Sequence, residues 1–433
     1  MEEKNKNKDR EENIKSIGDE LLIFIQRINC IAGSMWYIMA MLYNLKDATG
    51  MTLKKFVEKN ISIDTNEDDN HIEVPLHKYK TCKKIIKSFG NFEGALDIIP
   101  QSLFVTMVSQ FDAFIGRLMR KIYEYKPDIL NDSEFSYKYI DLVKIGSIEE
   151  AREELIEKSI ENILRKSHRD QISYLEKKLK VSLTKNLDSW PVFLELTERR
   201  NLFVHAEGKI SKHYVNQGKE LSYFLGDIPK CGDVLSITPD YFTKSYECLF
   251  EIAVKLTQVV WRLLENKVNK KIDENLNKIS YELVEQESYD LVCRILDFIF
   301  ENKAIKFSSD LYKLMLLLNR AQAYKWNGNQ SECQKILDTI DWSATEPKFK
   351  LARAVLLEDW NEACELMEIL SHDKDFVTCY PTWPIFKDFV KQPSFKEKYM
   401  EIYNEDFKDV EVSEEVILLG KLAKFGSDMM EKS

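Results

Sequence analysis

The chain has 433 residues, 44% of them hydrophobic, which is enough for two packed cores. Only 14 glycines and 10 prolines occur among many Leu, Ile, Lys and Glu residues, so we expect a mostly helical, all-α protein. The net charge of −10 argues against broad, nonspecific coating of nucleic acid, so any RNA contact would have to come from a local basic face. The eight cysteines form no C-x-x-C pair, which argues against a disulfide framework or zinc site and indicates small buried side chains in a reducing compartment.

The N-terminal part combines a charged tail with apolar helices. Residues 1–14 are mostly polar and charged, and we expect a disordered tail there and no signal peptide. Residues 15–96 predict N-terminal helices and a linker, with a polar, acidic loop at 62–77. The segment Leu21–Tyr43 is the one membrane candidate, but Gln26, Arg27 and Asn29 interrupt its apolar run. We interpret it as a buried helix or a dimer contact, and expect a soluble, cytoplasmic protein with no membrane partner.

Residues 97–266 predict an up-and-down bundle of four or five helices. Apolar residues recur at three- and four-residue steps from Ile98 to about Tyr125, and residues 147–180 indicate a second helix or helix pair. A third helix is expected at 190–206, with Pro191 in its first turn and Gly208 just beyond its end.

The bundle closes with a turn-rich segment and a last helix. Residues 219–237 predict a loop or small hairpin. Thr238 then caps a helix with Pro239 in its first turn, and this helix extends to Leu264.

Residues 267–405 have a different character. Segments 311–328 and 350–363 correspond at a spacing near thirty residues, with Ala321 and Ala323 matching Ala352 and Ala354. Small residues inside a helix, followed by a turn and another helix, resemble tetratricopeptide-like helical hairpins. Residues 406–433 predict a terminal helix or tail, whose apolar patch at 416–419 we expect to cap the stack.

The segment from Arg200 to His205 carries a fixed positive charge and a titratable base. These are the two groups needed to cut a phosphodiester without a metal: we expect His205 to take the proton from a ribose 2′-hydroxyl and Arg200 to stabilise the five-coordinate phosphorus. Asn201 lies one turn from His205, and we expect it to orient the substrate or the imidazole. On a regular helix, however, Arg200 and His205 are about 140° apart.

This segment, Arg-Asn followed by three apolar residues and His, resembles the signature of the HEPN superfamily. Three other segments support the likeness: the helix around Asp112, residues 211–214 after the motif, and residues 230–241 before the last helix. The resemblance covers roughly residues 97–266. It implies a metal-independent endoribonuclease without a cofactor or metal, acting on RNA as a homodimer whose active cleft lies at the dimer seam. It also suggests an effector of bacterial defence or a toxin.

Other residues are candidates for support of the site or for RNA contact: Asp112, Arg199, His168, Lys209 and Tyr214. Asp112 has an alternative role as the ion-pair partner of an arginine such as Arg199 or Arg200. Residues 161–215 hold eleven Lys and Arg against seven Asp and Glu, which suits a basic groove or simply a solvated helix face.

The family pattern is not complete. HEPN toxins controlled by nucleotidyltransferase antitoxins carry a tyrosine where this chain has Glu207, so we do not expect control by adenylylation there. A protein or peptide partner on the C-terminal repeats is the other regulatory hypothesis.

Three alternatives remain open at this stage. In the first, Arg200 is an arginine in a salt bridge and His205 is a histidine at a helix end, with no catalytic role. In the second, the bundle is a non-catalytic HEPN scaffold that binds RNA or protein. In the third, the chain is a helical-repeat adaptor and the motif is accidental.

Overall fold

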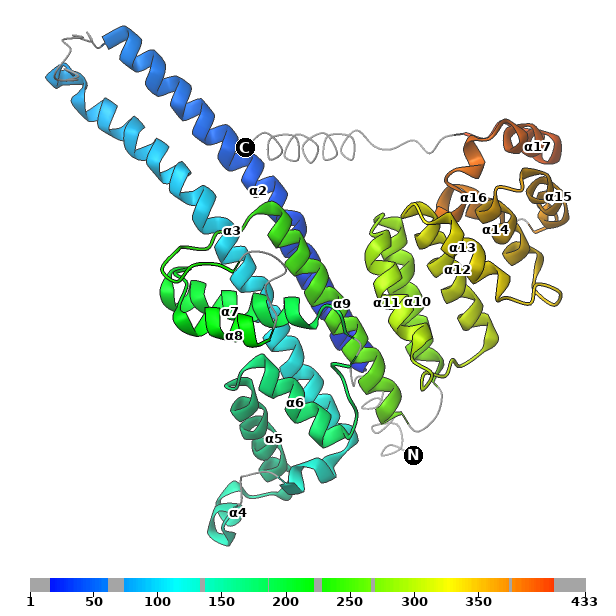
Figure 1. The fold of residues 1–433 in the computed structure, drawn as a ribbon, viewed down its shortest axis with the longest axis horizontal. Helices are drawn as coiled ribbons and strands as arrows, with labels where there is room; N and C mark the ends of the chain where they lie inside the picture. The colour runs from blue at the N-terminus through cyan, green and yellow to red at the C-terminus, as the bar shows by residue number, and fades with distance from the viewer. Residues whose placement is uncertain are drawn as a thin grey trace.

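The computed structural model describes residues 16–60, 74–132, 137–185, 187–221, 228–265, 269–373 and 376–408. Within these ranges all regular elements are helices, joined by loops, and the only β pairing is one isolated bridge between Lys209 and Val234. This confirms the all-α class. A long helical arm, a bundle around its base and a set of helix pairs make up the molecule (Figure 1). The expected tail at 1–14 and the apolar patch at 416–419 lie outside the described residues.

The arm is an antiparallel pair of long helices, α2 (Ile17–Asn60) and α3 (Leu76–Tyr125). Ion pairs join them near the base, Arg117 to Glu20 at 2.7 Å, and part of the way along the arm, Lys46 to Glu93 at 3.1 Å. With 44 and 50 residues, the helices are roughly 66 and 75 Å long. Their distal halves extend beyond the rest of the molecule (Figure 1).

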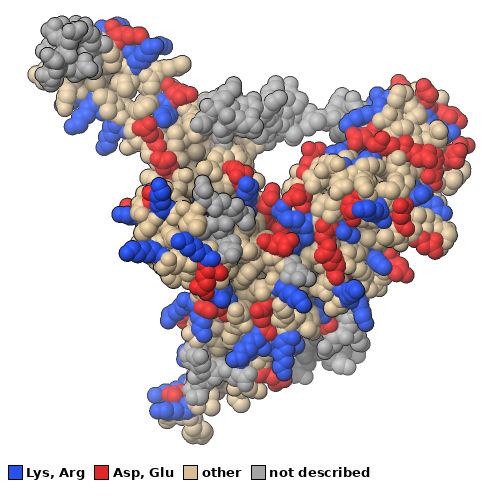
Figure 2. Space-filling view, in the orientation of Figure 1, with Lys and Arg blue, Asp and Glu red and all other residues tan. Residues whose placement is uncertain are grey.

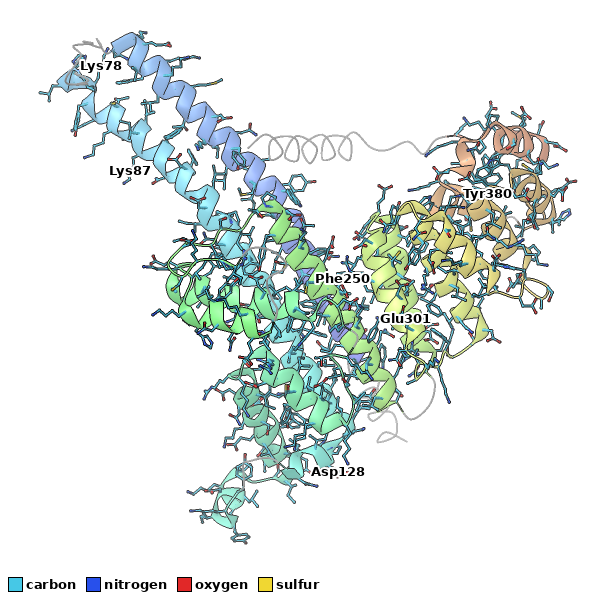
Figure 3. All side chains as sticks on the ribbon, in the orientation of Figure 1. Lys78, Lys87, Asp128, Phe250, Glu301 and Tyr380 are labelled. Atoms are coloured by element: carbon cyan, nitrogen blue, oxygen red, sulfur yellow. The ribbon has the colours of Figure 1, made fainter. Side chains whose placement is uncertain are left out.

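The expected border at residue 97 lies inside α3, so it does not separate two units. The helix starts at Leu76 and continues through the buried Pro100. Its distal part is rich in lysine and largely exposed; Figure 3 labels Lys78 and Lys87 there. The apolar periodicity from Ile98 onwards therefore marks the part of α3 that the bundle buries, and not the start of the helix.

The bundle surrounds the proximal half of α3. Helices α7 (Trp190–Ala206) and α9 (Pro239–Leu264) pack on α3, and α2 also packs on α9. A continuous core of buried apolar side chains joins these helices. The predicted bounds of α7 are confirmed, and Thr238 caps α9 through a 3.2 Å hydrogen bond from the Tyr241 amide.

Shorter helices complete the bundle. They are η1 (Pro127–Asp132), α4 (Tyr139–Ile145), α5 (Ile148–Leu164), α6 (His168–Leu179) and α8 (Lys212–Glu220). The segment 147–180 is thus a helix pair, because Ser147 and Ser167 each accept a hydrogen bond from a first-turn amide and begin a new helix.

The C-terminal region consists of consecutive helix pairs. They are α10 (Lys270–Glu285) with α11 (Tyr289–Glu301), α12 (Asp310–Trp326) with α13 (Gln330–Asp338), and α14 (Pro347–Leu357) with α15 (Trp360–Leu370). The four alanines that define the repeat are fully buried. Short helices follow: η2 (Phe376–Thr378), α16 (Cys379–Thr382), η3 (Pro384–Phe386), η4 (Phe389–Lys391) and α17 (Pro393–Tyr403).

A buried ionic cluster joins the bundle to the helix pairs. Glu251 on α9 is 2% exposed and accepts hydrogen bonds from Ser189 at 2.9 Å, Lys255 at 2.5 Å and Arg294 on α11 at 2.8 Å. Buried carboxylates need such partners. The main core also continues from α9 into α10 and α11, so the expected border after residue 266 does not separate two cores.

Two predictions about side-chain burial and membranes need revision. Cys30 and Cys231 are exposed, although all eight cysteines are free as expected. Among the described residues, two helices, α2 and α3, are long and apolar enough to cross a bilayer, where the sequence indicated one candidate. Core helices of soluble proteins have the same length and composition, so this finding alone places neither helix in a membrane.

Candidate active site

Three helices bring Asp112, His168 and Arg200 to one point. Arg200 Nη2 on α7 donates to Asp112 Oδ2 on α3 at 2.6 Å. His168 Nε2, at the start of α6, lies 2.6 Å from Asp112 Oδ1. The three side chains are 18%, 29% and 7% exposed in the order Arg200, Asp112, His168. A single carboxylate thus holds a fixed cation and an imidazole at the edge of the core.

His168 is an interior residue in contact with Asp112, so of the two roles considered for it, support of the site or RNA contact, the RNA-facing one is wrong. Its ring lies between Phe111 and Phe193, with centroids 6.4 and 5.7 Å away. The position follows from the helix start, because Ser167 caps α6 and turns the next residue towards α3. Asp112 supplies the polar partner that a buried imidazole requires.

Asp112 is the ion-pair partner of Arg200, one of the two arginines considered for it. Arg200 Nε is buried and has no hydrogen-bond partner among the described residues. The carboxylate therefore satisfies only part of the guanidinium, whose five N–H donors can serve several acceptors. The pair fixes the position of Arg200 and partly neutralises its charge.

His205 lies on a different face of α7 from Arg200. Its side chain is exposed, whereas Arg200 points to Asp112. The helix remains regular up to Ala206, so the angle of about 140° between the two positions holds. Asn201 is half-buried, one turn before His205. One chain therefore does not bring Arg200 and His205 to a common point.

The end of α7 is fixed by a turn that needs glycine. Gly208 has φ +77°, and a Cβ there would lie 2.8 Å from Phe203 Cε1 and 3.1 Å from the Leu235 carbonyl oxygen. The Gly208 amide donates to the Leu202 carbonyl at 3.1 Å, and the Gly208 carbonyl accepts from the Leu235 amide at 2.9 Å. These bonds hold the exposed His205 and the exposed Lys209 on a rigid corner.

Arg199 and Tyr214 are structural residues, so of the two roles considered for them, support of the site or RNA contact, the RNA-facing one is wrong. Glu195, 7% exposed, accepts hydrogen bonds from Arg199 Nε at 2.7 Å, from Tyr241 at 2.6 Å and from Tyr214. The Arg199 guanidinium also lies 3.8 Å from the centroid of the Tyr241 ring. Burial raises the pKa of both tyrosine hydroxyls, which keeps them protonated as donors.

Of the residues predicted for the site, the structure brings Asp112, His168 and Arg200 into contact. Asn201 is half-buried on α7, and His205 and Lys209 are exposed on α7 and on the turn that follows it. The described residues contain no group of three His, Cys, Asp or Glu side chains placed to hold a metal ion. On the face shown in Figure 2, basic and acidic side chains are interspersed. Comparison with family models, curated proteins and solved structures finds no match to this chain.

Proposed function

We propose that this chain is a metal-independent endoribonuclease of the HEPN type. The observation that carries the proposal is the Arg-Asn-x3-His segment on α7, in which Asp112 holds Arg200 while His205 stays exposed on a rigid corner. This supplies a positioned cation and an accessible base, the two groups that the reaction needs.

His205 acts as the general base. It accepts the proton of a ribose 2′-hydroxyl, whose oxygen then forms a bond to the adjacent phosphorus. The bond from phosphorus to the 5′-oxygen breaks and that oxygen takes up a proton from water, leaving a 2′,3′-cyclic phosphate and a 5′-hydroxyl end, while His205 returns its proton to the solvent. A positioned base of this kind accelerates such a step by about two to four orders of magnitude.

Arg200 stabilises the charge that develops on the non-bridging oxygens. Because Arg200 and His205 occupy different faces of α7, the reaction requires His205 of one copy beside Arg200 of a second copy. The active cleft then lies at the seam of a homodimer, and Asn201 orients the substrate within it. Asp112 acts as a positioning residue, since it holds Arg200 before RNA arrives.

The helix pairs provide the regulatory surface of a defence effector or toxin. Two adjoining pockets share Leu311 and Phe349: one of about 540 Å³ lies between α12 and the start of α14, and one of about 480 Å³ lies between α10, α12, α14 and the segment around α16. Apolar side chains line most of the smaller pocket, with Lys348 and Asp373 at its side, whereas half of the residues that line the larger pocket are polar or charged. This chemistry fits an apolar protein segment or peptide as the partner.

A non-catalytic scaffold for RNA or protein is the second candidate. The contact that favours it is the Arg200–Asp112 pair, which partly neutralises the cation that the reaction uses. In this case the contacts among Asp112, His168 and Arg200 only stabilise the bundle. The accessible Lys209 and the basic residues of α6 then bind RNA phosphates without cleavage.

Cleavage of single-stranded RNA in EDTA tests the proposal. We expect the wild type to cut and His205→Ala to lose at least a hundredfold in rate while keeping its fold and its assembly. His213→Ala is the matched control, because His213 is another exposed histidine, on α8, and lies outside the motif. RNA binding without cleavage, unchanged in His205→Ala, would instead support the scaffold.

A further inference from the structure

The outward face of α2 between Cys30 and Thr52 is almost without charge. Eleven residues in this range are exposed and one of them, Asp47, is charged. The next four exposed residues of the same helix all carry charge. The eleven are Cys30, Gly33, Ser34, Tyr37, Met41, Asn44, Leu45, Asp47, Ala48, Met51 and Thr52; the four that follow are Lys54, Lys55, Glu58 and Lys59. We refer to the eleven as the α2 face.

Large apolar side chains stand out on this face. Tyr37 is 37% exposed, Leu45 43%, Met41 63% and Met51 66%. A helix surface in contact with water is normally polar, and contiguous exposed apolar patches mark interaction sites.

The spacing along the α2 face matches a helical partner. Seven of its uncharged residues follow alternating steps of four and three: Cys30, Ser34, Tyr37, Met41, Asn44, Ala48 and Met51. A repeat of 3.5 residues keeps one stripe facing a second helix over several turns, with large and small side chains fitting between one another. We refer to these seven residues as the stripe. Its large side chains Tyr37 and Met41 lie between the smaller Ser34 and Ala48, so the stripe offers both knobs and the spaces that receive them.

We propose that the α2 face is the contact surface for a second copy of this chain. The partner is then the same helix, with the same spacing and with no charged side chain among the seven residues of the stripe to repel it, although each chain carries a net charge of −10. Taking about 200 Å² for a fully exposed large side chain, the four large residues show roughly 400 Å². Two copies bury about 800 Å² from these alone, and the seven smaller exposed residues raise the contact towards the ~1,200 Å² of specific interfaces.

A lipid bilayer fits the α2 face less well than a second copy of the chain does. The Lys46–Glu93 ion pair lies between α2 and α3 beside the face, and Asp97 is exposed one turn further along α3. Immersion of the arm in lipid would bury these groups together with Asp47, and charged side chains inside a bilayer are strongly unfavourable. A second protein helix covers the stripe and leaves them in water.

This contact is distinct from the cleft at the motif helix. Both α2 and α7 pack on α3 and α9, from different sides of that pair (Figure 1). A contact through the α2 face therefore leaves α7 free, and both contacts together build an assembly larger than a dimer. The inference does not rest on the ribonuclease proposal, and its test uses no RNA.

Light scattering on the full chain tests the contact through its mass. We expect the wild type to contain at least two copies of the 50.9 kDa chain. Met41→Glu places a charge in the middle of the stripe, weakens the contact tenfold or more and halves the mass. Ile369→Glu is the matched control, since Ile369 on α15 is 58% exposed and remote from the arm. An unchanged mass in Met41→Glu would overturn the proposal.

Thiol labelling gives a second readout. Cys30 belongs to the α2 face, while Cys231, which is also exposed, does not and serves as internal control. We expect iodoacetamide to label Cys30 at least tenfold more slowly than Cys231 in the wild type, and equally fast in Met41→Glu.

Three results would overturn the inference. A single-copy mass with fast labelling of Cys30 shows an open face. A single-copy mass with slow labelling shows that another segment of the same chain covers it. Binding of the single-copy protein to phosphatidylglycerol vesicles, lost in Met41→Glu, assigns the face to lipid.

Discussion

Substitution of Asp112 by asparagine probes the network at the candidate site. Asparagine keeps the volume of the side chain but removes the charge that both Arg200 and His168 contact at 2.6 Å. Hydrogen bonds to charged groups contribute about 1.5–3 kcal/mol each, and removal of one partner of a buried pair costs about 3–5 kcal/mol. Asp112 is 29% exposed and asparagine retains one acceptor, so we expect a loss of about 2–4 kcal/mol in unfolding free energy.

A double-mutant cycle assigns this loss to the pair. Urea unfolding is measured for Asp112→Asn, Arg200→Gln and the double variant. Because the two groups are in direct contact, we expect a coupling energy of about 1–3 kcal/mol. Additive effects within about 0.5 kcal/mol, or an Asp112→Asn variant as stable as the wild type, would refute the reasoning that Asp112 holds Arg200.

Three further predictions concern the fold. Gly208→Ala combines a positive φ with a close contact to Phe203 and should lose about 2–4 kcal/mol, whereas Gly232→Ala, at φ +101° in open space, should lose about 1 kcal/mol in thermal melts; equal losses would contradict the close contact. Glu251→Gln should lose about 3–5 kcal/mol in urea unfolding because it leaves buried cations without their carboxylate, while Glu247→Gln, whose side chain is 35% exposed, should lose about 1 kcal/mol or less. Burial raises the pKa of the Cys293 thiol to about 12. The stability that the protonated thiol contributes is complete below its unfolded pKa and is lost as pH rises from about 8.5 towards 12. Cys293→Ala should therefore flatten the fall in melting temperature between about pH 9 and 11.

The ends of the bundle helices could be predicted because their signals are local. Pro191 in the first turn and Gly208 beyond the last one define α7, and Thr238 with Pro239 defines the start of α9. Each signal acts within a few residues of the helix end that it sets. The start of α3 at Leu76 was missed because its distal part is exposed and therefore lacks an apolar stripe.

The internal contacts of the site could not be predicted in the same way. Asp112 is 56 residues from His168 and 88 from Arg200, so their meeting depends on how α3, α6 and α7 pack. No periodicity within one helix encodes that packing. The spacing of Glu195 and Arg199, four residues apart, was a usable signal for an ion pair on α7.

The end groups of RNA fragments test the central claim most directly. Purified protein is incubated with a defined single-stranded RNA in EDTA, and the products are analysed by mass spectrometry. We predict fragments with 2′,3′-cyclic phosphate and 5′-hydroxyl ends from the wild type, and intact RNA from His205→Ala at the same concentration. Intact RNA with the wild type, cleavage that requires added metal, or equal cleavage by His205→Ala would contradict the account.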